Sequence, residues 1–270
     1  MNVLVVGASG VVGVAVQKEL ANHGHRLRCL DVAPPGYEIA ALLELFGYEP
    51  SAPDAEWVYQ DILAPGVAEA AVKDMDACVY VTLANPAAET ALLQYSVNLA
   101  APRLLAEAAV RGNHCKLIYA STVSVLIGPE GHPVSESDPP QPWGDYGMSK
   151  WLAEEMLRLY TQWRGLRAIC LRLGTVHPHI RVALPAKYMQ YYIDVRDVAR
   201  AFRLAAEDTR IQFDVLQVVS RGEPEQCSPA RAKEVLGFEA RYNGPEHFAE
   251  RRCKGLEFLE KHPAPARRSA

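Results

Sequence analysis

Short apolar runs alternate along the chain with longer stretches in which apolar residues recur at helical spacing. The runs predicted to form strands are residues 2–6, 26–31, 57–60, 77–81, 116–120, 167–173 and 213–220. The stretches predicted to form helices are residues 10–23, 37–46, 67–73, 90–111 and 146–163. Near-continuous apolar strands are typical of parallel sheets that are covered on both faces. Because strand and helix alternate at crossover spacing, the sequence predicts a doubly wound parallel sheet of the α/β class.

Composition narrows the setting of this fold. The chain has 270 residues and a formal net charge of -4, which gives no electrostatic attraction to nucleic acid or to an anionic membrane. Its six cysteines are scattered without a CxxC pair, a pattern that favours reduced thiols over disulfides or a metal site. No apolar run approaches the roughly 20 residues needed to span a bilayer. We therefore expect a soluble cytoplasmic protein with no nucleic-acid or membrane partner and no bound metal.

A glycine-rich loop follows the first predicted strand and opens the first predicted helix. The loop reads Gly7-Ala8-Ser9-Gly10-Val11-Val12-Gly13. Glycines at such a turn let a pyrophosphate approach the backbone, where the N–H groups of the first helical turn can bind it. Asp31 ends the second strand about 20 residues further on, where a carboxylate can accept hydrogen bonds from ribose hydroxyls. That carboxylate would repel a 2′-phosphate, so the pattern favours NAD over NADP, with a turn-capping role for Asp31 as the alternative.

A tyrosine and a lysine lie four residues apart at the start of the predicted helix 146–163. Tyr146 and Lys150 share one helical face, so the ammonium could lower the pKa of the phenol, which is about 10 when unperturbed. The hydroxyl pair Ser121-Thr122 follows the fifth strand, at the carboxyl edge where such sheets bind ligands. Together these groups predict general acid/base chemistry on a substrate hydroxyl or carbonyl.

These residues, with several further motifs, resemble the short-chain dehydrogenase/reductases, and more closely their extended branch, the NAD-dependent epimerase/dehydratase type. The resemblance runs from residue 1 to about residue 236. Its further motifs are Asp61-Ile62, Leu83-Ala84, Tyr95-Ser96-Val97-Asn98, Tyr119-Ala120-Ser121-Thr122, Leu171-Arg172-Leu173-Gly174-Thr175, Tyr192–Ala199 and Val235–Phe238.

The resemblance implies a Rossmann-type fold and a role for each matched position. The catalytic positions are Thr122, Tyr146 and Lys150. The cofactor-binding positions are Gly7, Gly10, Val11, Val12, Asp31, Asp61, Ile62, Leu83, Ala84, Asn98, Tyr146, Lys150 and Leu173. In the family, the helices that correspond to 90–111 and 146–163 form a dimer interface, so we expect a homodimer. Residues 1–262 would form one Rossmann-type domain, with about 175–192 and 221–262 as a small substrate-binding part and 263–270 as a disordered tail.

One motif departs from the family. The segment Val125-Leu126-Ile127-Gly128 lacks the usual tyrosine and carries one extra residue, so Ser124 is an alternative to Thr122 for the hydroxyl role. Only about twenty residues separate Arg172 from Asp194, where relatives that act on nucleotide sugars carry a long segment. The short segment leaves little chain to enclose a nucleoside diphosphate. We therefore expect a small, unactivated substrate.

The compact length is similar to that of uronate dehydrogenases, which oxidise hexuronic acids with NAD. In that comparison Thr175 falls at a position that contacts substrate and nicotinamide. Arg181 lies near an arginine that grips the substrate carboxylate, a task that suits the fork of a guanidinium, although a solvated loop arginine is the alternative. Asn85 and Ser124 complete the predicted substrate-binding set.

The sequence therefore predicts an NAD-dependent oxidoreductase that moves a hydride between NAD and a carbon of a small sugar-like substrate. A hexuronic acid is the favoured substrate. One alternative is a sugar epimerase or dehydratase that recycles its cofactor internally, and the lack of an acidic pair after Thr122 weakens the dehydratase version. The other alternative is a non-catalytic NAD(H)-sensing protein, which the intact Tyr146 and Lys150 pair disfavours.

Overall fold

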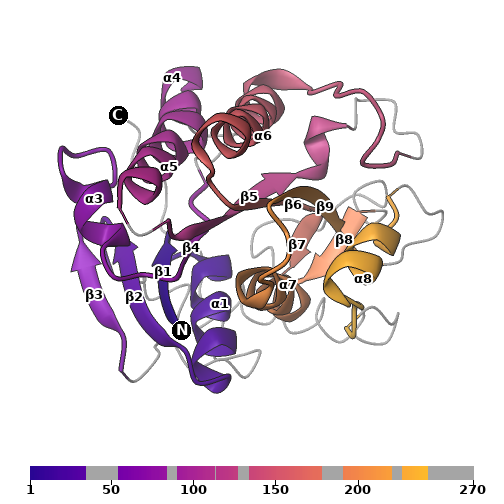
Figure 1. Cartoon of the computed structure of the whole chain (residues 1–270). Helices are drawn as coiled ribbons and strands as arrows, with labels where there is room; N and C mark the ends of the chain where they lie inside the picture. The colour runs from indigo at the N-terminus through magenta and orange to yellow at the C-terminus, as the bar shows by residue number, and fades with distance from the viewer. Residues whose placement is uncertain are drawn as a thin grey trace, which may run out of the picture.

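Seven parallel strands form the central sheet in the order β3-β2-β1-β4-β5-β6-β9 (Figure 1). The strands are β1 (Asn2–Val6), β2 (Arg26–Asp31), β3 (Glu56–Tyr59), β4 (Ala77–Tyr80), β5 (Lys116–Thr122), β6 (Ala168–Leu173) and β9 (Phe213–Val218). The computed structural model describes residues 1–34, 54–83, 90–112, 114–126, 134–177, 191–220 and 227–242. The order reverses between β1 and β4, which opens a crevice at the carboxyl ends of these two strands. The predicted doubly wound sheet is confirmed.

Helices cover both faces of the sheet, and each face has its own apolar core. One face carries α1 (Val11–Asn22) and α7 (Val195–Glu207), and the other carries α3 (Val67–Val72), α4 (Ala91–Tyr95), α5 (Ala101–Arg111) and α6 (Gly144–Arg164). Successive strand residues enter opposite cores, so that Val5 of β1 packs on the α1 side and Leu4 on the α5 side. None of the helices within the described ranges is long and apolar enough to cross a bilayer.

The predicted helix 90–111 is interrupted by a π-helical turn, Ser96–Ala100, between α4 and α5. Two buried tyrosines account for the interruption. The hydroxyl of Tyr80 donates to the carbonyl of Val97, and the hydroxyl of Tyr119 donates to the carbonyl of Asn98 at 2.7 Å. Carbonyls that bond to side chains are free to leave the regular helical pattern, and such turns are frequent at functional sites. The sequence pattern predicted the helix without this turn.

Several elements lie where the sequence analysis named only motifs. The strands β7 (Thr175–His177) and β8 (Tyr192–Asp194) form a separate two-stranded parallel sheet, and α8 (Ala230–Leu236) packs beside β9. The predicted helix 37–46 and tail 263–270 lie outside the described residues.

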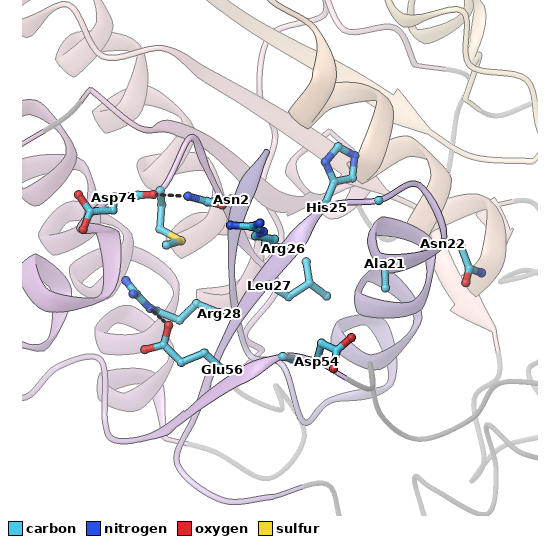
Figure 2. A pocket seen from close by; sticks show the side chains of 13 residues that line it. Asn2, Ala21, Asn22, His25, Arg26, Leu27, Arg28, Asp54, Glu56 and Asp74 are labelled. Atoms are coloured by element: carbon cyan, nitrogen blue, oxygen red, sulfur yellow. Dashed lines mark hydrogen bonds and ion pairs between the residues drawn. The ribbon is translucent and has the colours of Figure 1, made fainter.

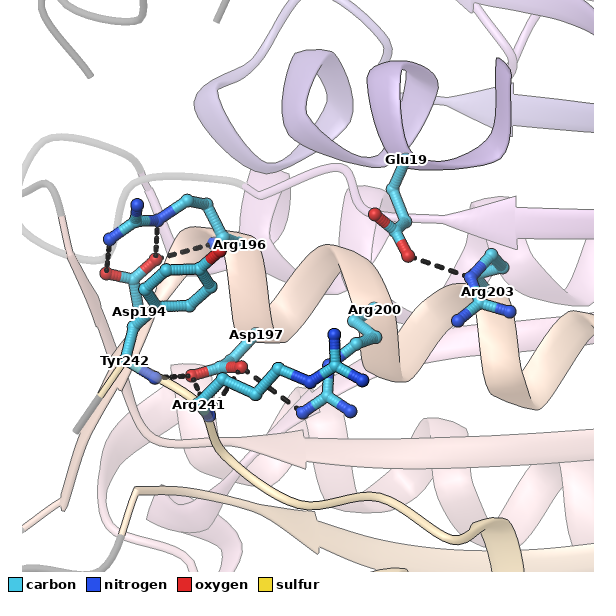
Figure 3. Close-up of polar contacts among 8 residues, drawn as sticks. All are labelled: Glu19, Asp194, Arg196, Asp197, Arg200, Arg203, Arg241 and Tyr242. Carbon is cyan, nitrogen blue, oxygen red and sulfur yellow. Dashed lines mark hydrogen bonds and ion pairs between the residues drawn. The ribbon is translucent and has the colours of Figure 1, made fainter. Parts of the chain in front are cut away.

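An acidic motif at the start of α7 holds the segment that follows α8 (Figure 3). Asp194 caps the helix by accepting from the N–H of Arg196 at 2.8 Å. The fully buried Asp197 accepts from the N–H groups of Arg241 and Tyr242, at 3.0 and 2.9 Å. The Arg196 guanidinium lies 3.4 Å from the centre of the Tyr242 ring. The motif 192–199 therefore positions the C-terminal part of the described chain.

A buried lysine fastens the other end of α7 to the sheet. The Nζ of Lys116, on β5, donates to the carbonyls of Ala205 and Asp208 at 2.7 and 2.6 Å. These carbonyls belong to the last turn of α7 and to its C-cap residue, so the ammonium supplies the cation that a helix C-terminus favours. Burial lowers the pKa of Lys116 to about 8.

Candidate active site

The glycine loop joins β1 to α1 at the carboxyl edge of the sheet. Gly7 ends the strand in a left-handed conformation (φ 85°), and its N–H donates to the carbonyl of Leu30 on the neighbouring strand. A Cβ on Gly13 would lie 2.1 Å from the carbonyl oxygen of Gly7, so only glycine allows α1 to pack this closely on the loop. The loop is therefore shaped by close backbone approach.

The start of α1 fits a pyrophosphate. Gly10 precedes the helix, no side chain caps it, and its first turn contains no acidic residue. The N–H groups of Val11 and Val12 belong to that first turn, where backbone donors have no partner within the helix. The positive end of the helix dipole and these donors are what a phosphate group requires. Gly10, Val11 and Val12 thus lie where the sequence placed them.

Asp31 ends β2 beside the glycine loop. Its carboxylate accepts from the N–H of Ser9 at 2.8 Å and from the N–H of Val32 at 2.8 Å. The side chain is half-buried, and a carboxylate that accepts two hydrogen bonds has capacity to accept more. The turn-capping role and the ligand role are therefore compatible in this geometry.

The other predicted cofactor contacts follow β3 and β4. Asp61 is exposed and accepts from the N–H of Leu63 at 2.9 Å, whereas Ile62 is buried in the core on the α5 side. Leu83 is exposed at the end of the described part of the β4 loop. Ala84, Asn85 and Arg181 lie outside the described residues.

The central feature of the site is a contact between β5 and α6. Thr122 is the last residue of β5, and its hydroxyl lies close enough to the phenol of Tyr146, in the first turn of α6, to favour the phenolate. Burial raises the pKa of Tyr146 to about 12, and the Thr122 hydroxyl opposes that rise. Thr122 also bonds to Ser124, whose N–H and hydroxyl lie 3.2 Å from its oxygen. The two candidates for the hydroxyl role are therefore in contact.

A glycine allows this contact to form. A Cβ on Gly147 would lie 2.8 Å from the carbonyl oxygen of Ser124. Any larger residue would push the start of α6 away from the 3₁₀ turn Val123–Val125 that follows β5. Gly147 therefore brings the Tyr146 and Thr122 side chains together, a role that the sequence analysis did not assign.

Lys150 lies deeper than its spacing from Tyr146 indicated. Its Nζ donates to the carbonyl of Ala120 at 2.8 Å and lies 4.8 Å from the centre of the Tyr119 ring. Burial lowers the pKa of Lys150 to about 7, and the carboxylate of Glu154 opposes that shift. The ammonium is thus anchored to β5, directly before the hydroxyl pair.

Asn98 is connected to the first turn of α6 through hydrogen bonds. It is fully buried in the π-helical turn, and its amide donates to the hydroxyl of Ser149 at 3.1 Å. Ser149 in turn donates to the carbonyl of Tyr146 at 2.9 Å. The Oδ1 of Asn98 is buried without a hydrogen-bond partner in the structure. This chain of contacts connects the π-helical turn to the first turn of α6.

The predicted substrate side of the site adjoins β6. Leu173 pairs in register with Thr122, and Thr175 follows on β7, where it pairs with Tyr192. Thr122, Tyr146, Lys150, Leu173 and Thr175 therefore gather at one end of β5, β6 and α6.

Sequence reasoning missed a buried ion pair beside this cluster. Arg172 on β6 donates to both carboxylate oxygens of Glu154, at 3.0 and 2.7 Å. Ser121 donates to the same carboxylate at 2.5 Å. The sequence contained a signal for this carboxylate, because Glu154 follows Lys150 by four residues and therefore shares its face of the helix.

A cavity of about 740 Å³ opens at the opposite, amino-terminal end of the strands (Figure 2). Its lining includes Asn2, Arg26, Arg28, Glu56 and Asp74. The Nε of Arg28 donates to Glu56 at 2.9 Å, so this arginine points away from the glycine loop. Parallel α/β sheets bind ligands at the carboxyl edge, and we assign no role to this cavity. No group of three or more His, Cys, Asp or Glu residues within the described ranges could hold a metal ion.

Comparisons with known proteins identify the family. The profile of the NAD dependent epimerase/dehydratase family matches residues 3–178. The uncharacterised protein y4nG of Sinorhizobium fredii is 28% identical over 173 residues, which are 64% of this chain and 40% of that protein. UDP-glucose 4-epimerase of Azospirillum brasilense is 37% identical over 82 residues, which are 30% of this chain and 24% of that protein. The chain thus spans less than half the length of these relatives.

Solved structures share the fold at low sequence identity. Uronate dehydrogenase from Agrobacterium tumefaciens has a TM-score of 0.73 at 21% identity, covering 100% of this chain and 92% of that chain. UDP-glucuronic acid 4-epimerase from Bacillus cereus, in complex with NAD, has a TM-score of 0.76 at 16% identity, covering 97% and 100%. The family profile spans well over half of the chain. The chain belongs to the NAD dependent epimerase/dehydratase family, and NAD is the cofactor of that family.

Proposed function

We propose that this protein is an NAD-dependent oxidoreductase that moves a hydride between NAD and the hydroxyl or carbonyl carbon of a small sugar-like substrate. The observation that carries the proposal is the proximity of the Thr122 hydroxyl and the Tyr146 phenol at the carboxyl edge of the sheet. The glycine loop opens on the same edge. A hydroxyl and a phenol in contact can hold one substrate oxygen between them.

The N–H groups of Val11 and Val12 would bind the pyrophosphate, and Asp31 would accept from the adenosine ribose. When bound, NAD supplies the hydride acceptor. The protein orients the substrate and transfers the proton. Thr122 and Tyr146 orient the substrate oxygen. The phenolate of Tyr146 accepts the hydroxyl proton at its oxygen during oxidation and returns it during reduction.

The charge state of the pair suits this task. Burial raises the pKa of Tyr146 to about 12 and lowers the pKa of Lys150 to about 7. Between these two pH values Tyr146 is a neutral phenol and Lys150 a neutral amine. Together they carry the same number of protons as a phenolate and an ammonium. Forming the phenolate while Lys150 becomes an ammonium therefore leaves the total number of protons on the two groups unchanged.

A hexuronic acid is the substrate class that we propose. The short segment between β6 and β8 leaves room for a small substrate, and the chain is similar over its whole length to a uronate dehydrogenase. Thr175 would contact the substrate next to the nicotinamide. Arg181 would bind the carboxylate, with Asn85 and Ser124 completing the pocket.

The test is the appearance of NADH when the protein and NAD⁺ meet hexuronates, free aldoses, polyols and simple alcohols in parallel. Turnover of hexuronates alone, lost in Arg181→Met, supports the proposed substrate. Turnover of another substrate class would support the oxidoreductase proposal and contradict the proposal that Arg181 binds a substrate carboxylate. Tight NAD⁺ binding with no turnover across the panel would contradict net oxidation.

A second candidate is an epimerase that recycles its cofactor internally. The observation that favours it is the likeness to UDP-glucose 4-epimerase within the catalytic family. Such an enzyme would interconvert sugar stereoisomers without accumulating NADH. Product analysis after incubation with catalytic NAD⁺ and UDP-sugars distinguishes it from the dehydrogenase.

We also propose a homodimer through α4, α5 and α6. These helices lie together on one side of the sheet (Figure 1), and Leu92, Leu93 and Trp163 on them are exposed. The exposed fractions are 78% for Leu92 on α4 and 74% for Trp163 at the end of α6, and an interface along these helices would cover both side chains. The cytoplasm is the proposed location, because the five described cysteines are buried free thiols.

A further inference from the structure

A carboxylate lies in the core behind the candidate active site. The side chain of Glu154 is 2% exposed and faces β5 and β6 from α6. Arg172 grips it with two hydrogen bonds, and Ser121 adds a third, at 2.5 Å. Burying this ion pair carries a desolvation cost that apolar residues of similar volume would avoid. Its position beside the site gives the pair a use beyond packing.

The carboxylate and Lys150 meet β5 at consecutive residues. Lys150 donates to the carbonyl of Ala120, and Ser121, the next residue, donates to Glu154. Lys150 and Glu154 are also four residues apart on α6, which places them on one helical face. Both side chains are buried, and the carboxylate favours the charged form of the lysine.

The other groups that face Lys150 do not replace this carboxylate. Tyr119 of β5 presents its ring, and burial raises the pKa of its hydroxyl well above the usual range. Cys170 of β6 is buried, and its thiol pKa is raised in the same way, so both groups are neutral at physiological pH. Arg172 of β6 is a cation, and Tyr146 of α6 is the proposed base. Among these groups, Glu154 alone is a carboxylate.

We propose that Glu154, held by Arg172 and Ser121, is a positioning residue that raises the proton affinity of Lys150 and thereby sets the pH range in which Tyr146 accepts a proton. The step that depends on Lys150 and Tyr146 rests on the proposed function. The electrostatic coupling between Glu154 and Lys150 does not, because it belongs to the protein without substrate. The two can therefore fail separately.

The direct experiment follows the side-chain Cε resonance of Lys150 in protein labelled with ¹³C-lysine, assigned by its loss in Lys150→Met. We expect a titration midpoint at about 7, because burial lowers the pKa of Lys150. In Glu154→Gln the midpoint should fall by about one pH unit or more, the usual effect of removing a neighbouring opposite charge. An unchanged midpoint would overturn the proposal, whatever the activity of the enzyme.

The matched control is Glu155→Gln, on the same helix and with the same loss of charge. Glu155 is 42% exposed and pairs with Arg158, so solvent screens it and the midpoint of Lys150 should stay in place. An equal shift in both variants would reduce the proposal to a general effect of net charge. Glu154→Asp keeps the charge, so the titration midpoint of Lys150 should lie close to the wild-type value.

The single variant leaves Arg172 buried without its partner and can fail to fold. The double variant Glu154→Gln/Arg172→Met removes both charges and should still show the lowered midpoint. Recovery of the wild-type midpoint in the double variant would show that Glu154 serves only to neutralise Arg172.

Turnover gives the second readout. In Glu154→Gln the rise of kcat/KM with pH should move to lower pH, and kcat should fall with KM nearly unchanged, because the phenolate is formed less often. A lost kcat with an unmoved pH profile would indicate a structural role alone. If the wild-type enzyme turns over no substrate, the proposed function fails, and the lysine titration still decides the coupling.

Discussion

The hydroxyl of Thr122 lies beside the phenol of Tyr146, across the junction of β5 and α6, and favours the ionised form of that phenol. The contact joins residues 24 positions apart that the sequence analysis placed in one site from motif order alone. It depends on Gly147, because a side chain there would meet the carbonyl of Ser124. The absence of a side chain at residue 147 therefore influences the protonation of Tyr146, the proposed base.

Replacing Thr122 by Val should slow turnover and move its pH dependence. The Thr122 hydroxyl opposes the burial that raises the pKa of Tyr146, so its loss shifts the base to higher pH. A hydrogen bond to a charged group contributes about 1.5–3 kcal/mol, which corresponds to roughly a 10- to 100-fold loss of kcat/KM. Thr122→Ser should retain most activity. A full effect from Ser124→Ala with Thr122→Val silent would assign the hydroxyl role to Ser124.

Replacing Tyr146 by Phe should abolish turnover and leave NAD⁺ binding nearly intact. The phenol supplies the proton transfer, which contributes about 10²–10⁴-fold to catalysis, whereas the pyrophosphate and ribose contacts lie on β1, α1 and β2. Calorimetric titration with NAD⁺ beside a rate assay checks both halves. A variant that loses the cofactor along with its activity would count against Tyr146 as the base.

Replacing Asp31 by Asn should relax the choice between NAD⁺ and NADP⁺. Asparagine can still accept from the N–H of Ser9, so the loop keeps its shape while the charge that repels a 2′-phosphate disappears. We expect a fall of about tenfold in NAD⁺ affinity, about 1.4 kcal/mol, with a gain for NADP⁺. Asp138→Asn removes the same charge from a loop contact with Ser135 and should change neither affinity.

Replacing Lys116 by Met should destabilise the fold by about 1–3 kcal/mol near pH 7, because two carbonyls of α7 lose their donor. Burial lowers the pKa of Lys116 to about 8, below its value in the unfolded chain. The unfolded state therefore binds more protons between pH 8 and about 10.4, and this group adds stability as pH rises through that window. Urea unfolding across the window should show the variant without that gain. Parallel pH curves for both proteins would contradict the assignment.

Replacing Leu92 by Lys should dissociate the proposed dimer. Leu92 is 78% exposed on α4, and a charge buried in an apolar interface costs several kcal/mol. Sedimentation velocity measures the outcome directly. The matched variant Tyr59→Lys places the same charge on the edge strand β3 and should leave the assembly unchanged. A wild-type protein that sediments as a monomer would remove the interface.

The apolar periodicity predicted the parallel sheet and most helices, because strands buried on both faces have a pattern that surface loops do not share. Motif order predicted that Thr122, Tyr146 and Lys150 belong together. The π-helical turn was not predictable, since Tyr80 and Tyr119 reach it from strands that are distant in sequence. The depth of Lys150 and the carboxylate of Glu154 also depend on tertiary packing. Spacing along a helix does not distinguish a lysine that faces the cleft from one that is anchored to β5.

Asp197 accepts hydrogen bonds from the N–H groups of Arg241 and Tyr242. This contact limits where the chain can be truncated or joined to a homologue. A chain that ended at α8 would remove both backbone donors of Asp197, which is fully buried in the intact fold, and leave Arg200 as its remaining partner among the contacts described. Truncation for crystallisation must therefore retain residue 242. A graft of the C-terminal part from a homologue would have to bring two free backbone amides to the same place.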